Sequence, residues 1–156
     1  MTWPIWMTLS ATLGLLIADQ RENKPLCWVF KPTAALGFIF FALEKGALNS
    51  SYGTTLLIGL ILCFAGDVLL LPKNEKSFLA GIGAFLLGHV GFAVAFLVRG
   101  VDSQVALGTA LPLMIVGLIV YRWLKPHLQG FMQKAVIAYI AAILVMVIAA
   151  VGTTAL

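Results

Sequence analysis

Charged residues are scarce in this chain. Asp, Glu, Lys and Arg together make up 10% of its 156 residues, whereas 62% are hydrophobic. A soluble domain carries about 25% charged residues, so this composition excludes one and predicts an integral membrane protein. The net charge is +4, but nine of the ten Lys and Arg residues are scattered through short polar segments. No basic cluster with interleaved aromatic residues indicates nucleic-acid binding.

Cysteine is rarer still, and the pattern needed for a metal site is missing. Cys27 and Cys63 both lie within apolar stretches, without CxxC or metal-type spacing. We interpret them as free thiols that pack as small hydrophobic residues. The opening segment MTWPIWMTLSATLGLLIA lacks the positively charged start and the small-residue cleavage site of a signal peptide. It is therefore predicted to be a retained first helix.

What the chain has in abundance is long apolar runs. A helix needs about 17–25 residues to cross a bilayer, and six runs come close to this length, the first being the shortest. The sequence predicts an all-α fold, a polytopic transmembrane helical bundle that forms one domain over residues 1–156. Short connections make consecutive helices antiparallel neighbours. The predicted spans are residues 3–18, 26–43, 54–71, 77–98, 105–121 and 131–155.

The positive charges also predict an orientation. Seven Lys and Arg residues fall in the first, third and fifth connections, and two fall in the second and fourth. Because cytoplasmic loops carry the excess of Lys and Arg, the odd-numbered connections are predicted to be cytoplasmic and the N-terminus to lie outside. This pattern fits a bacterial inner membrane, and a protein of the endoplasmic reticulum would look similar.

Three ionisable residues, Lys31, Asp67 and His89, lie inside the apolar runs. A charge at the bilayer centre costs about 2.5–3.5 kcal/mol on insertion scales, so such residues indicate a functional site. At a rise of about 1.5 Å per residue, Lys31 and Asp67 lie roughly 6–8 Å from the cytoplasmic side, and His89 and Tyr139 lie roughly 12–18 Å deep. If their helix faces converge, the four residues form one pocket that opens to the cytoplasm.

Each of these residues also has a purely structural interpretation. Lys31 is near a helix end and could extend to the membrane surface. Lys31 and Asp67 could form a structural ion pair, and His89 could be a neutral histidine bonded to a backbone carbonyl. Tyr139 could be a packing residue. The ionisable set could also serve a small transporter or proton relay, although no internal repeat or pair of interrupted helices supports one.

Three segments, WVFKP, GDVLLLP and GIGAFLLGH, closely resemble the YhhN-like family of polytopic membrane proteins, whose characterised members are lysoplasmalogenases. KP stands at 31–32, GD at 66–67 and F-x-x-G-H at 85–89, and the Tyr139 helix follows in the same order. Family members often have a tyrosine where this chain has Phe92. They usually have eight helices and a late acidic motif, so a chain that stops at VGTTAL is expected to be a fragment.

The resemblance implies hydrolysis of the vinyl-ether bond of lysoplasmalogen to a fatty aldehyde and glycerophosphoethanolamine or glycerophosphocholine, without metal or organic cofactor. It implies a lysophospholipid and the bilayer as partners. Asp67 would be the general acid and base. Burial raises the pKa of a carboxyl, whereas a nearby cation such as Lys31 lowers it. Lys31 would be its charge partner or a phosphate contact, His89 would orient water or relay the proton, and Tyr139 would contact substrate. A non-catalytic lysolipid-binding protein is the alternative.

Overall fold

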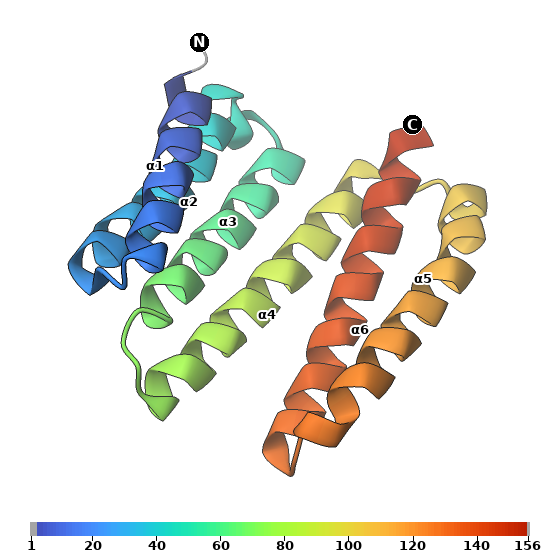
Figure 1. Ribbon diagram of the computed structural model, residues 1–156. Helices are drawn as coiled ribbons and strands as arrows, with labels where there is room; N and C mark the ends of the chain where they lie inside the picture. Colours follow the sequence, from blue (N-terminus) through green and yellow to red (C-terminus); the bar gives the residue numbers. More distant parts are fainter. Residues whose placement is uncertain (1–2, 156) are drawn as a thin grey trace. The chain divides into compact units, whose positions relative to one another are not determined.

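The computed structural model describes residues 3–155, and within this range it is built from helices without a strand, which confirms the all-α prediction. Figure 1 shows the helices in chain order, with short 3-10 turns at Ala47–Asn49 (η1), Lys125–His127 (η2) and Thr153–Ala155 (η3). The six α-helices are α1 (Trp3–Gln20), α2 (Lys24–Glu44), α3 (Ser51–Leu69), α4 (Glu75–Arg99), α5 (Ser103–Leu124) and α6 (Phe131–Gly152).

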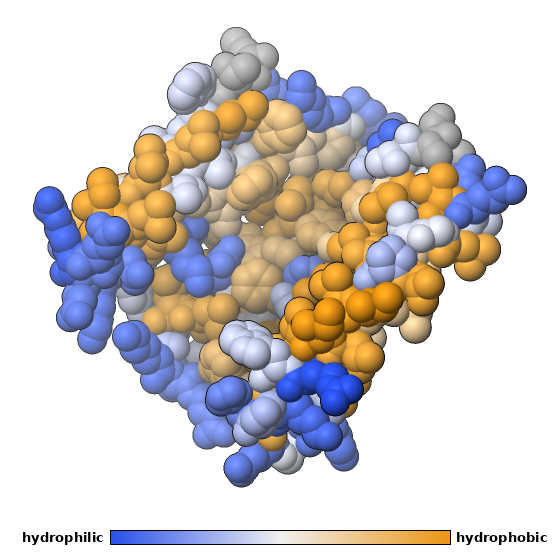
Figure 2. Space-filling view, turned by 45° about the vertical axis from the view of Figure 1, so that its right-hand side comes forward, coloured by the Kyte–Doolittle hydropathy of each residue, from blue (hydrophilic) through white to orange (hydrophobic). Residues whose placement is uncertain are grey.

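Five of these helices, α2 to α6, are long and apolar enough to cross a membrane. The described part of α1 falls short of the same standard, because Asp19 and Gln20 lie within its 18 residues. A crossing by the predicted span 3–18 therefore stays a prediction. Large apolar side chains remain exposed along the helices, as for Leu107 and Leu111 on α5. Figure 2 shows apolar residues along helix flanks and hydrophilic ones towards helix ends, as lipid contact requires.

Several helices begin or end at other residues than the predicted spans, and polar caps explain two of the differences. Helix α3 begins at Ser51 instead of residue 54, because the Ser50 Oγ accepts a hydrogen bond from the Gly53 N–H at 3.0 Å. Helix α5 begins at residue 103 instead of 105, with Asp102 Oδ1 accepting from the N–H of Val105 at 3.0 Å. Helix α6 ends at Gly152 instead of residue 155, where the chain tightens into η3.

Two further boundaries differ for other reasons. Helix α2 begins at Lys24 instead of residue 26, because Pro25 at its start needs no hydrogen-bond partner for a backbone N–H. Helix α3 ends at Leu69 instead of residue 71, just before Pro72. Proline disfavours a helical conformation in the residue that precedes it, so the apolar run extends beyond the helix.

The chain forms two compact units, residues 1–88 and 89–156, and α4 passes from the first to the second between Gly88 and His89. The first contains α1, α2, α3 and the first part of α4. The second contains the remainder of α4 together with α5 and α6. The prediction of a single domain over 1–156 stays a prediction.

Small residues let the helices of the first unit approach closely. Helices α1 and α2 pack side by side (Figure 1), and the Thr8 hydroxyl on α1 donates a hydrogen bond to the Ala34 carbonyl on α2 at 3.4 Å. A Cβ placed on Gly88 of α4 would lie 2.6 Å from the Cys63 sulfur of α3. Such contacts fit the packing of membrane helices, where backbones meet at small side chains.

The second unit is held by contacts between α5 and α6. The Gln133 Nε2 donates a hydrogen bond to the Tyr121 hydroxyl at 3.0 Å. At the other end of the two helices, the Asp102 N–H donates to the Gly152 carbonyl at 3.1 Å. Gly117 lies against Leu144, where a Cβ would come within 2.8 Å of its side chain. Polar contacts therefore fix both ends of this helix pair, and apolar packing fills the middle.

Candidate active site

The structure brings together two of the predicted site residues, Lys31 of α2 and Asp67 of α3. The Lys31 Nζ lies 3.4 Å from Asp67 Oδ1. Because α2 and α3 are antiparallel neighbours, a residue near the start of one helix meets a residue near the end of the other. Exposed fractions of 29% for the Lys31 side chain and 26% for that of Asp67 leave both groups reachable. The ion pair is therefore accessible from outside the two helices.

Pro32 directly follows Lys31 inside α2. Proline has no N–H, so residue 32 cannot donate the usual helical hydrogen bond to the carbonyl of Trp28. One residue further on, the Thr33 hydroxyl donates to the Val29 carbonyl at 2.7 Å. The KP pair therefore has two effects within one turn of α2. It places the Lys31 ammonium there, and it leaves the Trp28 carbonyl without its usual helical hydrogen-bond donor. The sequence interpretation noted the KP motif without this consequence.

Two cavities of the first unit meet at the Lys31–Asp67 pair. The outer cavity, of about 1050 Å³, carries the charged residues Asp19, Glu22, Lys24 and Lys73. The inner cavity, of about 300 Å³, contains Asp67 in a mainly apolar wall. Leu15 and Lys31 line both cavities. The pair therefore stands at the boundary between a charged compartment and an apolar one.

Among the charged residues of the outer cavity, Lys24 and Lys73 were interpreted from the sequence only as topology signals, and Asp19 and Glu22 were given no role. Lys24 and Asp19 come from the first connection and its flanking helix ends, and Lys73 comes from the third connection. Both connections are predicted to lie on the cytoplasmic side, which is the one signal that could have indicated a shared location. The sequence does not show that their side chains surround a common space.

The other two predicted residues, His89 and Tyr139, meet in the second unit. The His89 ring of α4 lies edge-on to the Tyr139 ring of α6, with centroids 5.2 Å apart and planes inclined by 62°. Phe92 packs against the same imidazole, with ring centroids 6.2 Å apart. The structure thus forms two pairs, Lys31–Asp67 in the first unit and His89–Tyr139 in the second. The predicted convergence of all four residues in one pocket stays a prediction.

The chemistry available at the Lys31–Asp67 pair is proton transfer beside a positive charge. A carboxyl group can donate or accept a proton, and a neighbouring ammonium can bind an anionic group such as a phosphate. Within residues 3–155, no three His, Cys, Asp or Glu side chains lie close enough to hold a metal ion. A pair placed between a charged and an apolar cavity is suited to a substrate with a charged head and a hydrocarbon tail.

Comparison with known proteins adds a family. The sequence model of the YhhN family matches residues 26–156. Lysoplasmalogenase TMEM86A of Bos taurus is 28% identical over 116 residues, which make up 74% of this chain and 43% of the bovine protein. The chain therefore spans less than half the length of this curated relative. No solved structure matches the chain.

Proposed function

This chain belongs to the YhhN family, and we propose that it hydrolyses the vinyl-ether bond of lysoplasmalogens within the membrane. The products are a fatty aldehyde and a glycerophosphoethanolamine or glycerophosphocholine. The observation that carries this proposal is the 3.4 Å Lys31–Asp67 pair at the boundary between a charged and an apolar cavity. The similarity to a bovine lysoplasmalogenase supports the same reaction.

Asp67 is the proposed general acid and base. Its carboxylic acid transfers a proton to the vinyl carbon farther from the ether oxygen, which makes the nearer carbon an oxocarbenium ion. Water adds to that carbon and returns one proton to the Asp67 carboxylate. The resulting hemiacetal breaks its bond to the glycerol oxygen, and the hemiacetal hydroxyl proton moves to that oxygen. One water is consumed, and Asp67 ends in the acid form in which it began.

Lys31 is proposed to act as the charge partner of Asp67 or as a contact to the lipid phosphate. The outer cavity adds Lys24 and Lys73, whose ammonium groups suit an anionic head group. In this arrangement the phosphate lies in the outer cavity and the vinyl-ether bond lies at Asp67. Because these lysines border connections predicted to be cytoplasmic, we propose a cytoplasmic opening in a bacterial inner membrane. Thiol labelling of a cysteine placed at Asn74, from either side of the membrane, checks this orientation.

His89 and Tyr139 are proposed to act in the same reaction, His89 by orienting water or relaying a proton and Tyr139 by contacting substrate. His89→Gln should then lower kcat on the order of tenfold, less than the roughly 10²–10⁴-fold of direct proton transfer. Tyr139→Phe should raise KM about two- to tenfold, the worth of one hydrogen bond. Steady-state kinetics of both variants measure these effects. Unchanged kinetics with a lowered Tm would instead assign the pair to packing.

The proposed reaction is tested with the purified chain in phospholipid nanodiscs. Lysoplasmalogen should release fatty aldehyde, whereas a matched lysophospholipid with a saturated ether should release none. The reason is chemical, since only the vinyl ether has a carbon–carbon double bond that accepts the proton. Aldehyde release is measured with a coupled dehydrogenase. Binding of both lipids without aldehyde from either would contradict the proposal and select a non-catalytic lysolipid-binding protein.

A further inference from the structure

A third cavity of the first unit continues from the inner one. This distal cavity, of about 370 Å³, lies between the ends of α2 and α3 that are far from Lys31. Phe38 and Leu60 line both the inner and the distal cavity. Outer, inner and distal cavities therefore follow one another along α2 and α3, with the Lys31–Asp67 pair at the first junction and Phe38 with Leu60 at the second.

The line of cavities follows one face of each helix. On α2, residues 31, 35, 38 and 42 line it, followed by the C-cap residue 45, and on α3 residues 67, 63, 60 and 56 do so. Steps of three and four residues are the spacing of a single helix face. The cavities therefore lie along a continuous groove between α2 and α3.

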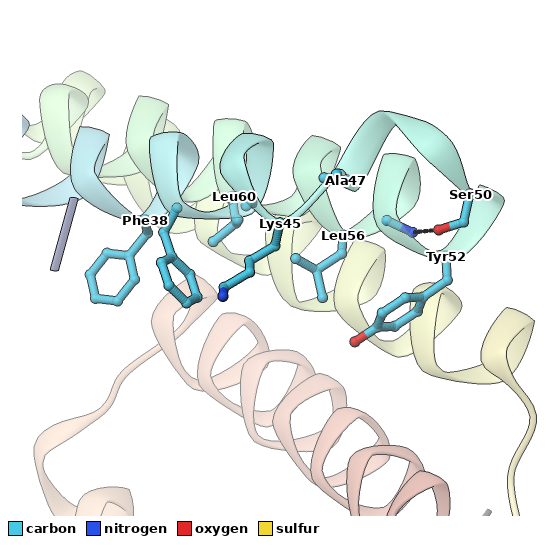
Figure 3. Close-up of a pocket in the computed structure, with 11 residues that line it drawn as sticks. Phe38, Lys45, Ala47, Ser50, Tyr52, Leu56 and Leu60 are labelled. Atoms are coloured by element: carbon cyan, nitrogen blue, oxygen red, sulfur yellow. Dashed lines mark hydrogen bonds between the residues drawn. The ribbon is translucent and has the colours of Figure 1, made fainter. Parts of the chain in front are cut away.

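Polarity changes along this groove in one direction. The outer cavity is rich in charge, the inner one has polar groups only near the pair, and the distal one is mainly apolar. Figure 3 shows the Lys45 side chain between Phe38 and Leu56, with Tyr52 and Ser50 farther along the cavity. The Lys45 ammonium lies over the Phe41 ring, 5.3 Å from its centroid. The groove therefore begins at a charged compartment and continues into mainly apolar space.

The length of the groove suits one hydrocarbon chain. Lys31 of α2 and Lys45, the C-cap residue directly after it, are fourteen residues apart, about 21 Å at a rise of about 1.5 Å per residue. Each leaflet contributes about 15 Å to the hydrocarbon core of a bilayer, which is the depth its own acyl chains fill. A chain that starts at Lys31 passes Phe38 after about 10 Å and has its end in the distal cavity.

We propose that the inner and distal cavities hold the single hydrocarbon chain of the lysolipid, with Phe38 and Leu60 at the point where a long chain enters the distal cavity. This inference rests on the proposed function for the identity of the substrate. The bilayer is as apolar as the groove, so the groove gains little from hydrophobic burial. Its effect is positional: it fixes which bond of the chain lies at Asp67, and the distal cavity receives only a chain long enough to pass Phe38 and Leu60.

The experiment uses lysophosphatidylcholines that carry a photoreactive diazirine at the end of an ester-linked chain, either stearoyl or decanoyl. The stearoyl probe should label Phe41 and Leu56 in the distal cavity, and the decanoyl probe should label Ala35 and Phe64 in the inner one. Excess unlabelled lysophosphatidylcholine should abolish both. Labelling that is independent of chain length, or that falls mainly on the exposed residues Ile58 and Ile61 of α3, would overturn the groove.

A matched pair of variants sharpens the result. Leu56→Trp fills the distal cavity, so stearoyl labelling of Phe41 should be lost while decanoyl labelling stays unchanged. Ile58→Trp adds the same side chain to an exposed position of α3 and should change neither. If Leu56→Trp does not fold, Ala35→Leu in the inner cavity should displace both probes. Stearoyl labelling that persists in the folded filled variant contradicts the proposal.

The outcome is separable from that of the proposed function. The ester-linked probes contain no vinyl ether, so their labelling does not depend on turnover. If the protein is labelled in the groove but releases no aldehyde, the groove for the hydrocarbon chain is supported and the proposed hydrolase activity is excluded. If the protein releases aldehyde but its labelling does not depend on chain length, the hydrolase activity is supported and the groove is excluded.

Discussion

Replacing Asp67 by asparagine should abolish measurable aldehyde release, lowering kcat by about 10²–10⁴-fold, the usual contribution of a general acid or base. Asparagine has nearly the same size and keeps an oxygen near the Lys31 ammonium, but it has no acidic proton to give to the vinyl carbon. The fold should survive, because the inner cavity loses no volume. Aldehyde release from lysoplasmalogen in nanodiscs, together with Tm, measures both effects.

The matched control is Glu75→Gln. Glu75 is another carboxylate of the first unit, lies in the first turn of α4 and lines none of the cavities described above. Its removal should leave kcat and KM unchanged. Full activity in Asp67→Asn would exclude Asp67 as the proton donor, although the hydrolysis of lysoplasmalogen itself would still stand.

Replacing Lys31 by methionine should lower kcat/KM by about 10- to 10²-fold, because hydrogen bonds to charged groups contribute about 1.5–3 kcal/mol. Methionine keeps an unbranched side chain of similar length and removes the ammonium group 3.4 Å from Asp67. Lys31→Arg, which keeps the positive charge, should retain most of the activity. Lys76→Met at the start of α4, outside the three cavities, should have no effect.

The substrate can separate the two roles proposed for Lys31. An alkenylglycerol, which has the vinyl ether but no phosphate, cannot use a phosphate contact. If Lys31 binds phosphate, Lys31→Met should impair lysoplasmalogen hydrolysis and leave alkenylglycerol hydrolysis unchanged. If it acts through Asp67, both substrates should be impaired by the same factor. Full activity of Lys31→Met on lysoplasmalogen contradicts both roles.

The pairing of Lys31 with Asp67 could be predicted because it depends on few quantities. Apolar runs located the helices, the loop charges gave a direction, and the rise per residue placed both side chains at one level. Antiparallel neighbours then allow contact at that level. The remaining uncertainty was whether the two helix faces converge, and the 3.4 Å distance between Nζ and Oδ1 answers that question.

Other features could not be predicted, for identifiable physical reasons. The start of α3 depends on one hydrogen bond from Gly53 to the Ser50 hydroxyl, which an apolar run does not reveal. The contact of His89 with Tyr139 depends on how α4 and α6 are rotated, and depth alone gave no such detail. The cavities depend on gaps between side chains of several helices. Charges such as Lys24 and Lys73, counted singly, indicated topology and not a shared compartment.

Pro32 has a consequence for how α2 can respond to a bound lipid. The helix loses one hydrogen bond there, and such positions are where helices bend. Residues before the proline, such as Lys24 and Trp28, line the outer cavity, and residues after it, such as Ala35 and Phe38, line the inner one. Pro32 therefore separates the segment of α2 that lines the outer cavity from the segment that lines the inner one. A bend at this position would change the width of the outer cavity and leave the packing of the second segment unchanged.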